Sequence, residues 1–171
     1  MSRLTTQLLA IIKTDTVSDR GERNLISGNL GLLSGFDFNV NSPLQTTLYA
    51  PFTVSYDRAS GAVGMVLEAY NPQVQIAAPG GTTHYKLSCG VSELDFAGAT
   101  YVSHTQTTEI LPYNNTPATA PNLNVQITAN SSLSVVQVLS IEFYQEVNAK
   151  MYALQNGGFN AMAVVQVSQP T

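Results

Sequence analysis

Residues 133–147 read LSVVQVLSIEFYQEV. One face of this stretch, taken as an extended chain, carries Leu133, Val135, Leu139, Ile141 and Phe143, and the other carries Ser134, Ser140, Glu142 and Tyr144. Because successive side chains of a β-strand point to opposite faces, one face is suited to a core and the other to water or a partner. The stretch therefore predicts a long, half-buried strand.

The same alternation recurs along most of the chain, at residues 36–40, 52–56, 63–69, 85–91, 123–127 and 159–167. Residues 100–102 and 109–111 are further, short candidate strands. Residues 58–61, Arg-Ala-Ser-Gly, suit a hairpin turn between two of these runs. Short turns and no intervening helices disfavour a parallel βαβ architecture. The sequence predicts a mainly β fold, an antiparallel β-sandwich of the immunoglobulin-like or jelly-roll kind. In that sandwich the expected core residues are Phe38, Leu87, Val135, Leu139, Ile141 and Val165.

One helix is predicted, at the N-terminus. Leu4, Leu8, Ile11 and Ile12 recur at helical spacing, and Ser2 is a suitable N-cap. A short helical turn or an ordered loop is expected between residues 15 and 35. The sequence thus divides into residues 1–35, a helix with a Gly-rich connecting segment, and residues 36–171, the β-sandwich domain.

Charge is scarce in this chain. Only 11% of its residues are charged, whereas about 25% is usual in a soluble domain. After residue 23 the only cations are Arg58, Lys86 and Lys150, too few for the basic stripe that nucleic-acid binding requires. No apolar run approaches the ~20 residues of a membrane span. Residues 8–12 are too short for the core of a secretion signal, so none is expected at this start.

No catalytic or metal-binding constellation is predicted. His84 and His104 have no carboxylate at a metal-ligand spacing. Cys89, the single cysteine, falls on the apolar face of its strand and is expected to be a buried thiol. Two carboxylate pairs, Glu93 with Asp95 and Glu142 with Glu146, each share one strand face and are expected to be solvated. No cofactor is expected.

Tyrosines offer a different possibility, since aromatic rings stack on sugars and also enrich protein interfaces. Five are expected to be partly exposed: Tyr49, Tyr70, Tyr101, Tyr113 and Tyr144. A concave patch of coplanar tyrosines would favour a glycan-binding module. Tryptophan, the preferred platform for sugars, is absent from the sequence.

Several blocks of the sequence resemble a protein family of Bacteroidota that has no assigned activity. The blocks are residues 14–23, 35–39, 47–53, 76–86, 141–148 and 156–161. The resemblance covers most of the chain but implies no site. Members of that family carry a further basic region ahead of the position of Arg3, which implies that the first helix is the tail of a longer element.

The predicted function is that of a non-enzymatic structural protein whose copies assemble into a filament, tubule or shell, in an extracellular or virion-like setting. Low charge removes long-range repulsion between copies, and faces of amides and hydroxyls pack without burying ions. The predicted assembly interface is the apolar stripe of Leu4, Leu8, Ile11 and Ile12. The alternatives are a glycan-binding or adhesive module and a phage-derived tail or capsid component.

Overall fold

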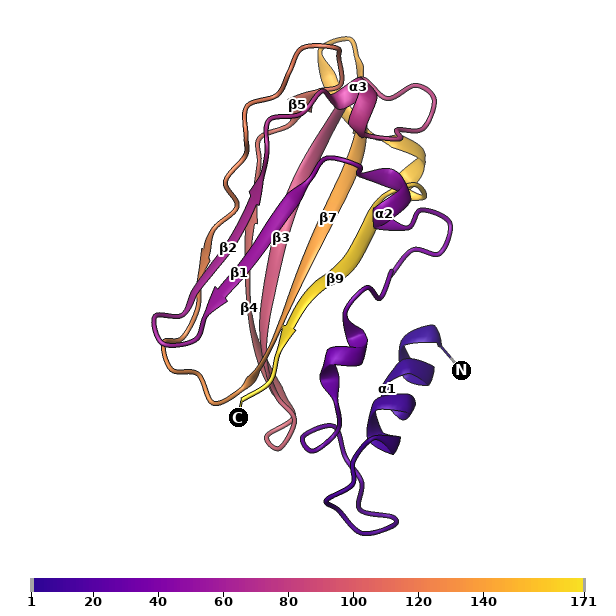
Figure 1. Cartoon of the computed structure of the whole chain (residues 1–171). Coiled ribbons are helices and arrows are strands. Elements are labelled where there is room, and N and C mark those ends of the chain that lie inside the picture. Colours follow the sequence, from indigo (N-terminus) through magenta and orange to yellow (C-terminus); the bar gives the residue numbers. More distant parts are fainter. Residues whose placement is uncertain (1, 171) are drawn as a thin grey trace.

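A computed structural model describes residues 2–170, which form two antiparallel sheets curled into a half-barrel, with a short N-terminal helix beside them (Figure 1). The predicted mainly β, antiparallel sandwich with a short N-terminal helix is confirmed. The helices are α1 (Arg3–Lys13), α2 (Leu44–Thr47) and α3 (Pro72–Gln75), with 3₁₀ turns η1 (Leu30–Leu33) and η2 (Leu154–Gly157). The strands are β1 (Phe52–Asp57), β2 (Ala62–Leu67), β3 (His84–Asp95), β4 (Thr100–Thr107), β5 (Leu111–Pro112), β6 (Val125–Gln126), β7 (Ser134–Val147), β8 (Lys150–Ala153) and β9 (Ala161–Ser168).

Residues 134–147, from the long alternating stretch 133–147, form β7, a central strand of the larger sheet. It pairs with β3 along one edge, and along the other with β8 near its end and β9 near its start. The larger sheet has the order β4-β3-β7-β8, with β5 beside β3 and β9 beside β7. The smaller sheet has the order β1-β2-β6. Strand β4 therefore lies at one edge of the larger sheet.

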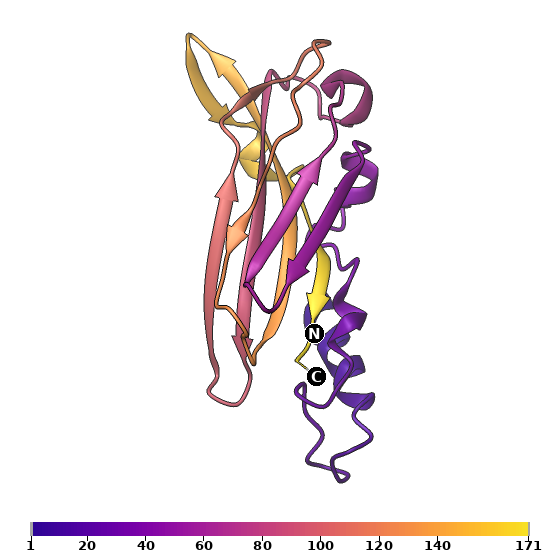
Figure 2. The same ribbon diagram turned by 60° about the vertical axis from the view of Figure 1, so that its left-hand side comes forward.

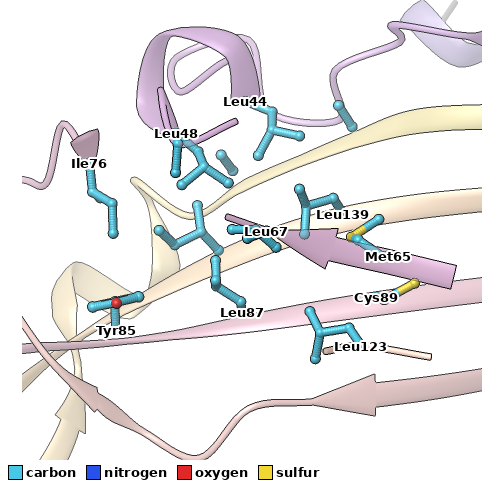
Figure 3. Close-up of a cluster of buried hydrophobic side chains, with 14 of the residues drawn as sticks. Leu44, Leu48, Met65, Leu67, Ile76, Tyr85, Leu87, Cys89, Leu123 and Leu139 are labelled. Carbon is cyan, nitrogen blue, oxygen red and sulfur yellow. The ribbon is translucent and has the colours of Figure 1, made fainter. Parts of the chain in front are cut away.

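The main core lies between the two sheets (Figure 3). Leu87, Val135, Leu139 and Ile141 are buried there, as predicted. Val165 is half-buried and packs against the same cluster. Met65 and Leu67 reach the core from β2, and Leu44 and Leu48 close it near α2.

The prediction for Phe38 is wrong, because its side chain is 43% exposed. Residues 36–40 do not form a strand, and only Asp37 makes an isolated bridge, to Ala163 of β9. The alternation of this short run is real, but it lies outside the two sheets. The Phe38 ring instead packs edge-on against Phe36, with 5.2 Å between the ring centres.

A second, smaller cluster lies on the outer face of the larger sheet. Its buried members are Ile11 of α1, Leu30 and Leu33 of η1, and Val164 of β9. Residues 2–35, which belong to the N-terminal segment predicted from the sequence, therefore pack directly on the larger sheet of the β-sandwich domain (Figure 1). The expected short helical turn between residues 15 and 35 is confirmed as η1.

Candidate assembly surfaces

Helix α1 turns its apolar stripe toward its own sheet. Ile11 is fully buried, whereas Leu4 and Leu8 are half-buried and pack against the outer cluster. Ile12 is also half-buried. Ser2 caps the helix as predicted, because its side chain accepts a hydrogen bond from the amide of Thr5. The prediction that the stripe contacts another copy stays a prediction, but such a contact through Ile11 would require α1 to leave its present position.

The loop after α1 is held in place by Asp15, whose side chain is fully enclosed. Its carboxylate accepts hydrogen bonds from the amides of Val17 (2.9 Å), Ser18 (3.0 Å) and Asn24 (3.1 Å). The amide of Ser18, with the other two, holds the pKa of this carboxyl well below its ordinary value. Such amide bonds favour the charged form of a carboxyl and fix the loop around it.

The C-terminal tail holds the same region from the other side. Gln169 donates from its side chain to the carbonyl of Gly28 (2.8 Å) and accepts from the amide of Leu30 (2.9 Å). Gly28 itself lies against α1, where an added Cβ would stand 2.7 Å from the carbonyl oxygen of Ile11. Helix α1 is therefore fastened to the sandwich by packing and by hydrogen bonds of its connecting loop.

The edge of β9 that faces away from β7 is covered at one end by the N-terminal segment. Gly35 donates its amide to the carbonyl of Val164 (2.8 Å), Val164 donates to Phe36 (3.0 Å), and Phe38 donates to Met162 (2.8 Å). Near the other end, the guanidinium of Arg58 donates to the carbonyl of Ser168 (3.1 Å). This edge is thus capped at both ends by residues of its own chain.

Strand β4 forms the opposite edge of the larger sheet (Figure 2). Its eight residues are all exposed. It reads TYVSHTQT, without Asp, Glu, Lys, Arg or Pro. Natural proteins usually blunt such an edge with charge, proline, a bulge or a covering segment. Within residues 2–170, β4 pairs with β3 alone. The sequence predicted only a short strand at residues 100–102 here, although the β-branched content of residues 100–107 favours the longer one.

The register with β3 determines which backbone groups of β4 point away from the sheet. Thr108 donates its amide to the carbonyl of Leu87 (2.9 Å), and bonded and non-bonded pairs alternate along an antiparallel ladder. With the observed register, the backbone N–H and C=O groups that point away from β3 are those of Tyr101, Ser103, Thr105 and Thr107.

A cleft of about 440 Å³ opens between the chain around α2 and strand β9. Leu44, Leu48 and Phe52 line one side, and Val165 lines the other. Tyr49, 57% exposed, lies at this cleft. The lining is largely apolar, and such a concave surface can take a ring or an apolar side chain.

The tyrosines do not gather into one surface. Tyr70 is buried, and its hydroxyl lies 2.6 Å from that of Tyr85, so its predicted exposure is wrong. Tyr49 lies near β9, whereas Tyr101 lies on β4 at the opposite edge of the larger sheet. Tyr113 and Tyr144 are half-buried.

The predicted solvated position of Glu93 is also wrong, since the side chain is only 2% exposed. Glu93 follows Val91 in the inward phase of β3, and its carboxylate accepts from the hydroxyl (3.0 Å) and amide (3.3 Å) of Thr128. Burial alone raises the pKa of a carboxyl, but hydrogen bonds from Ser131 and Thr128 outweigh it and lower the pKa of Glu93.

Two ion pairs lie on the larger sheet. Glu142 accepts from Lys86 (3.2 Å) and from the hydroxyl of Tyr144 (2.6 Å), and Glu146 lies 4.0 Å from His84. Cys89 is buried, as predicted, and burial raises the pKa of its thiol. Within residues 2–170, no cluster of three or more His, Cys, Asp or Glu could hold a metal ion.

None of the helices in residues 2–170 combines the length and the apolar character needed to cross a bilayer. No family model, curated protein or solved structure matches this chain. The resemblance to a Bacteroidota family stays a prediction.

Proposed function

We propose that this chain is a non-enzymatic structural protein that assembles with copies of itself, as the subunit of a filament, tubule or shell. The observation that carries the proposal is the edge of β4, which is long, regular, exposed and uncharged. A strand edge without charge, proline or a covering segment can pair with a strand of another molecule. The low charge of the whole chain, −4 over 171 residues, adds little repulsion between copies.

The chemistry of the described residues supports a non-enzymatic role. Glu93, the one deeply buried glutamate, is bound by Thr128, and Glu142 is engaged by Lys86 and Tyr144. Glycosidase-like acid–base catalysis requires two carboxylates that face each other across a cleft. The 440 Å³ cleft instead has a largely apolar lining, with Asp37 as its one carboxylate.

The packing of α1 bears on which surface makes the contact. Ile11 already lies inside its own chain, so an interface through the apolar stripe would need α1 to exchange between copies. The edge of β4 needs no such rearrangement. We therefore propose β4 as the primary contact and exchange of α1 as the alternative route.

Light scattering of the purified chain over a range of concentrations tests the proposal. We expect masses above the 18.3 kDa of one chain, equally at ~0.1 M and ~1 M salt, because backbone and apolar contacts are little affected by screening. Negative-stain microscopy of the same samples distinguishes filaments, shells and small oligomers. A chain that stays monomeric at high concentration would overturn the proposal.

Tyr49 favours a second candidate, a glycan-binding module. Its ring is more than half exposed and lies beside a concave surface, and tyrosine rings stack on apolar faces of ligands. Screening a panel of immobilised glycans with the parent and with Tyr49→Ala tests this candidate. Binding that Tyr49→Ala abolishes supports it, and no binding to any glycan overturns it.

A further inference from the structure

We infer that two copies of this chain pair through β4, antiparallel and related by a two-fold axis that passes beside His104. This inference rests on the proposed function and deepens it by naming the partner and the register. The paired edge would join the larger sheets of both copies into one continuous sheet. Because a two-fold contact closes on itself, the resulting dimer would be the unit that a second contact extends into a filament, tubule or shell.

The register follows from which backbone groups are free. The backbone N–H and C=O groups that point away from β3 belong to Tyr101, Ser103, Thr105 and Thr107. An antiparallel, two-fold pairing that overlaps residues 101–107 completely places 101 opposite 107 and 103 opposite 105. All four residues of each copy then meet as hydrogen-bonded pairs, which gives eight backbone hydrogen bonds.

Other registers are poorer. A shift by two residues leaves at least one of these four residues without a partner. A shift by one residue places hydrogen-bonding groups opposite the wrong positions and reverses the faces of the side chains. The fully overlapped register is thus the one that satisfies the edge completely.

The side chains suit this register. On the outer face, Tyr101, which is 72% exposed, would cover Thr107 of the second copy. On the inner face, Val102 would lie opposite Gln106. Aromatic and β-branched cross-strand pairs stabilise sheets, whereas like charges directly opposite destabilise them. No position of β4 carries a fixed charge, so none of these pairs is repulsive at neutral pH.

His104 lies at the centre of the pairing, directly opposite His104 of the second copy. Both are in a non-hydrogen-bonded pair, in which the side chains approach most closely. A charged side chain at residue 104 would therefore face its own copy, and like charges directly opposite each other destabilise a sheet.

Cross-linking through engineered cysteines tests the register. Cα atoms of a non-hydrogen-bonded pair are ~4.5 Å apart, within the range that a disulfide spans. We expect His104→Cys to form a covalent dimer under mild oxidation. The parent is the control, because its only cysteine, Cys89, is buried.

Two further variants provide a matched control. Two copies of Val102→Cys would hold their cysteines four residues apart along the strands, about 14 Å, and so would two copies of Gln106→Cys. Neither variant alone should cross-link. Mixed together they should, because residue 102 of one copy lies opposite residue 106 of the other.

A fixed charge at residue 104 gives an independent readout. We expect the dissociation constant of His104→Lys to exceed that of the parent on the order of tenfold at low salt, and that of His104→Gln to stay close to the parent's. If the parent associates but His104→Cys and the mixed variants do not cross-link, the β4 pairing is wrong while the proposed assembly stands. If the parent is monomeric throughout, both fail.

Discussion

The Glu93 carboxylate lies in the sandwich interior, two residues along β3 from Val91, and accepts hydrogen bonds from Thr128 and Ser131. Its lowered pKa means that the folded state favours the charged form. The stability that it contributes is therefore present above the ordinary glutamate pKa of ~4.3, and it is lost as the pH falls through the lower folded pKa.

Glu93→Gln should lower the unfolding free energy by about 1–3 kcal/mol at neutral pH, because charge-assisted hydrogen bonds are lost. The difference from the parent should shrink between about pH 5 and pH 2, as Glu93 of the parent becomes protonated. Urea unfolding at several pH values measures both effects. Glu109→Gln, at an exposed position, is the control and should change little. A difference that is the same at every pH would contradict this account.

Leu139 and its neighbour Ser140 test the phase of β7. Leu139 is fully buried, whereas Ser140 is half-buried on the opposite face. Leu139→Ala should cost about 2–5 kcal/mol of unfolding free energy through lost burial and the remaining cavity. Ser140→Ala should be nearly silent. Chemical denaturation compares the two, and similar losses at both positions would show that the assigned faces are wrong.

The two edges of the larger sheet differ in whether other segments of the chain supply them with hydrogen-bond partners. At β9 the segment around Gly35 and Phe36 supplies backbone partners, and Arg58 fixes the other end. At β4, within residues 2–170, no segment supplies backbone partners to the outer edge, although β6 of the smaller sheet lies close by. Because the edge at β4 lacks the backbone partners that the edge at β9 has, we propose that β4 contacts another copy.

Thr105→Pro should remove association while leaving the fold intact. The Thr105 amide points away from β3, and proline is tolerated in an edge strand where the missing N–H faces solvent. Proline removes one donor of the proposed pairing and obstructs the approach of a second strand. Thr105→Val keeps the amide and should associate like the parent. Sedimentation measures association, and circular dichroism checks the fold.

If Thr105→Pro folds and associates as strongly as the parent, the contact lies elsewhere. The same measurement on Thr105→Val separates loss of the amide from loss of the hydroxyl. Weakening in both variants to the same extent would also contradict a backbone-mediated contact.

At the scale of the whole molecule, the N-terminal segment acts as part of the sandwich. Removing residues 1–14 would uncover Leu30, Leu33 and Val164. We expect the melting temperature to fall on the order of 10 °C, with the β-sheet circular dichroism retained. We expect the oligomeric state to persist, since β4 is untouched. A shift to monomer with an unchanged melting temperature would instead favour assembly through Leu4, Leu8, Ile11 and Ile12.

Much of the architecture was predictable from local pattern. Period-two alternation in residues 133–147 and 85–91 correctly assigns the faces of β7 and β3, because a strand has only two faces. The same phase, carried on from Val91, would have placed Glu93 in the interior. The charge of Glu93 led to the prediction of a solvated position, but hydrogen bonds from the distant Thr128 and Ser131 compensate for its burial.

The sequence by itself determined the fold class, the helix with its Ser2 cap and the strand phases, because these depend on residues close together in the chain. Only the tertiary structure decided that Phe38 lies outside the core, that Ile11 is enclosed by its own sheet, and that β4 keeps a free edge. Each of these depends on which distant segment lies alongside: residues 36–40 lie beside β9, α1 lies beside η1, and β6 lies near β4 without pairing with its outer edge. Local periodicity carries no information about such neighbours, since any apolar face can be buried by any complementary one.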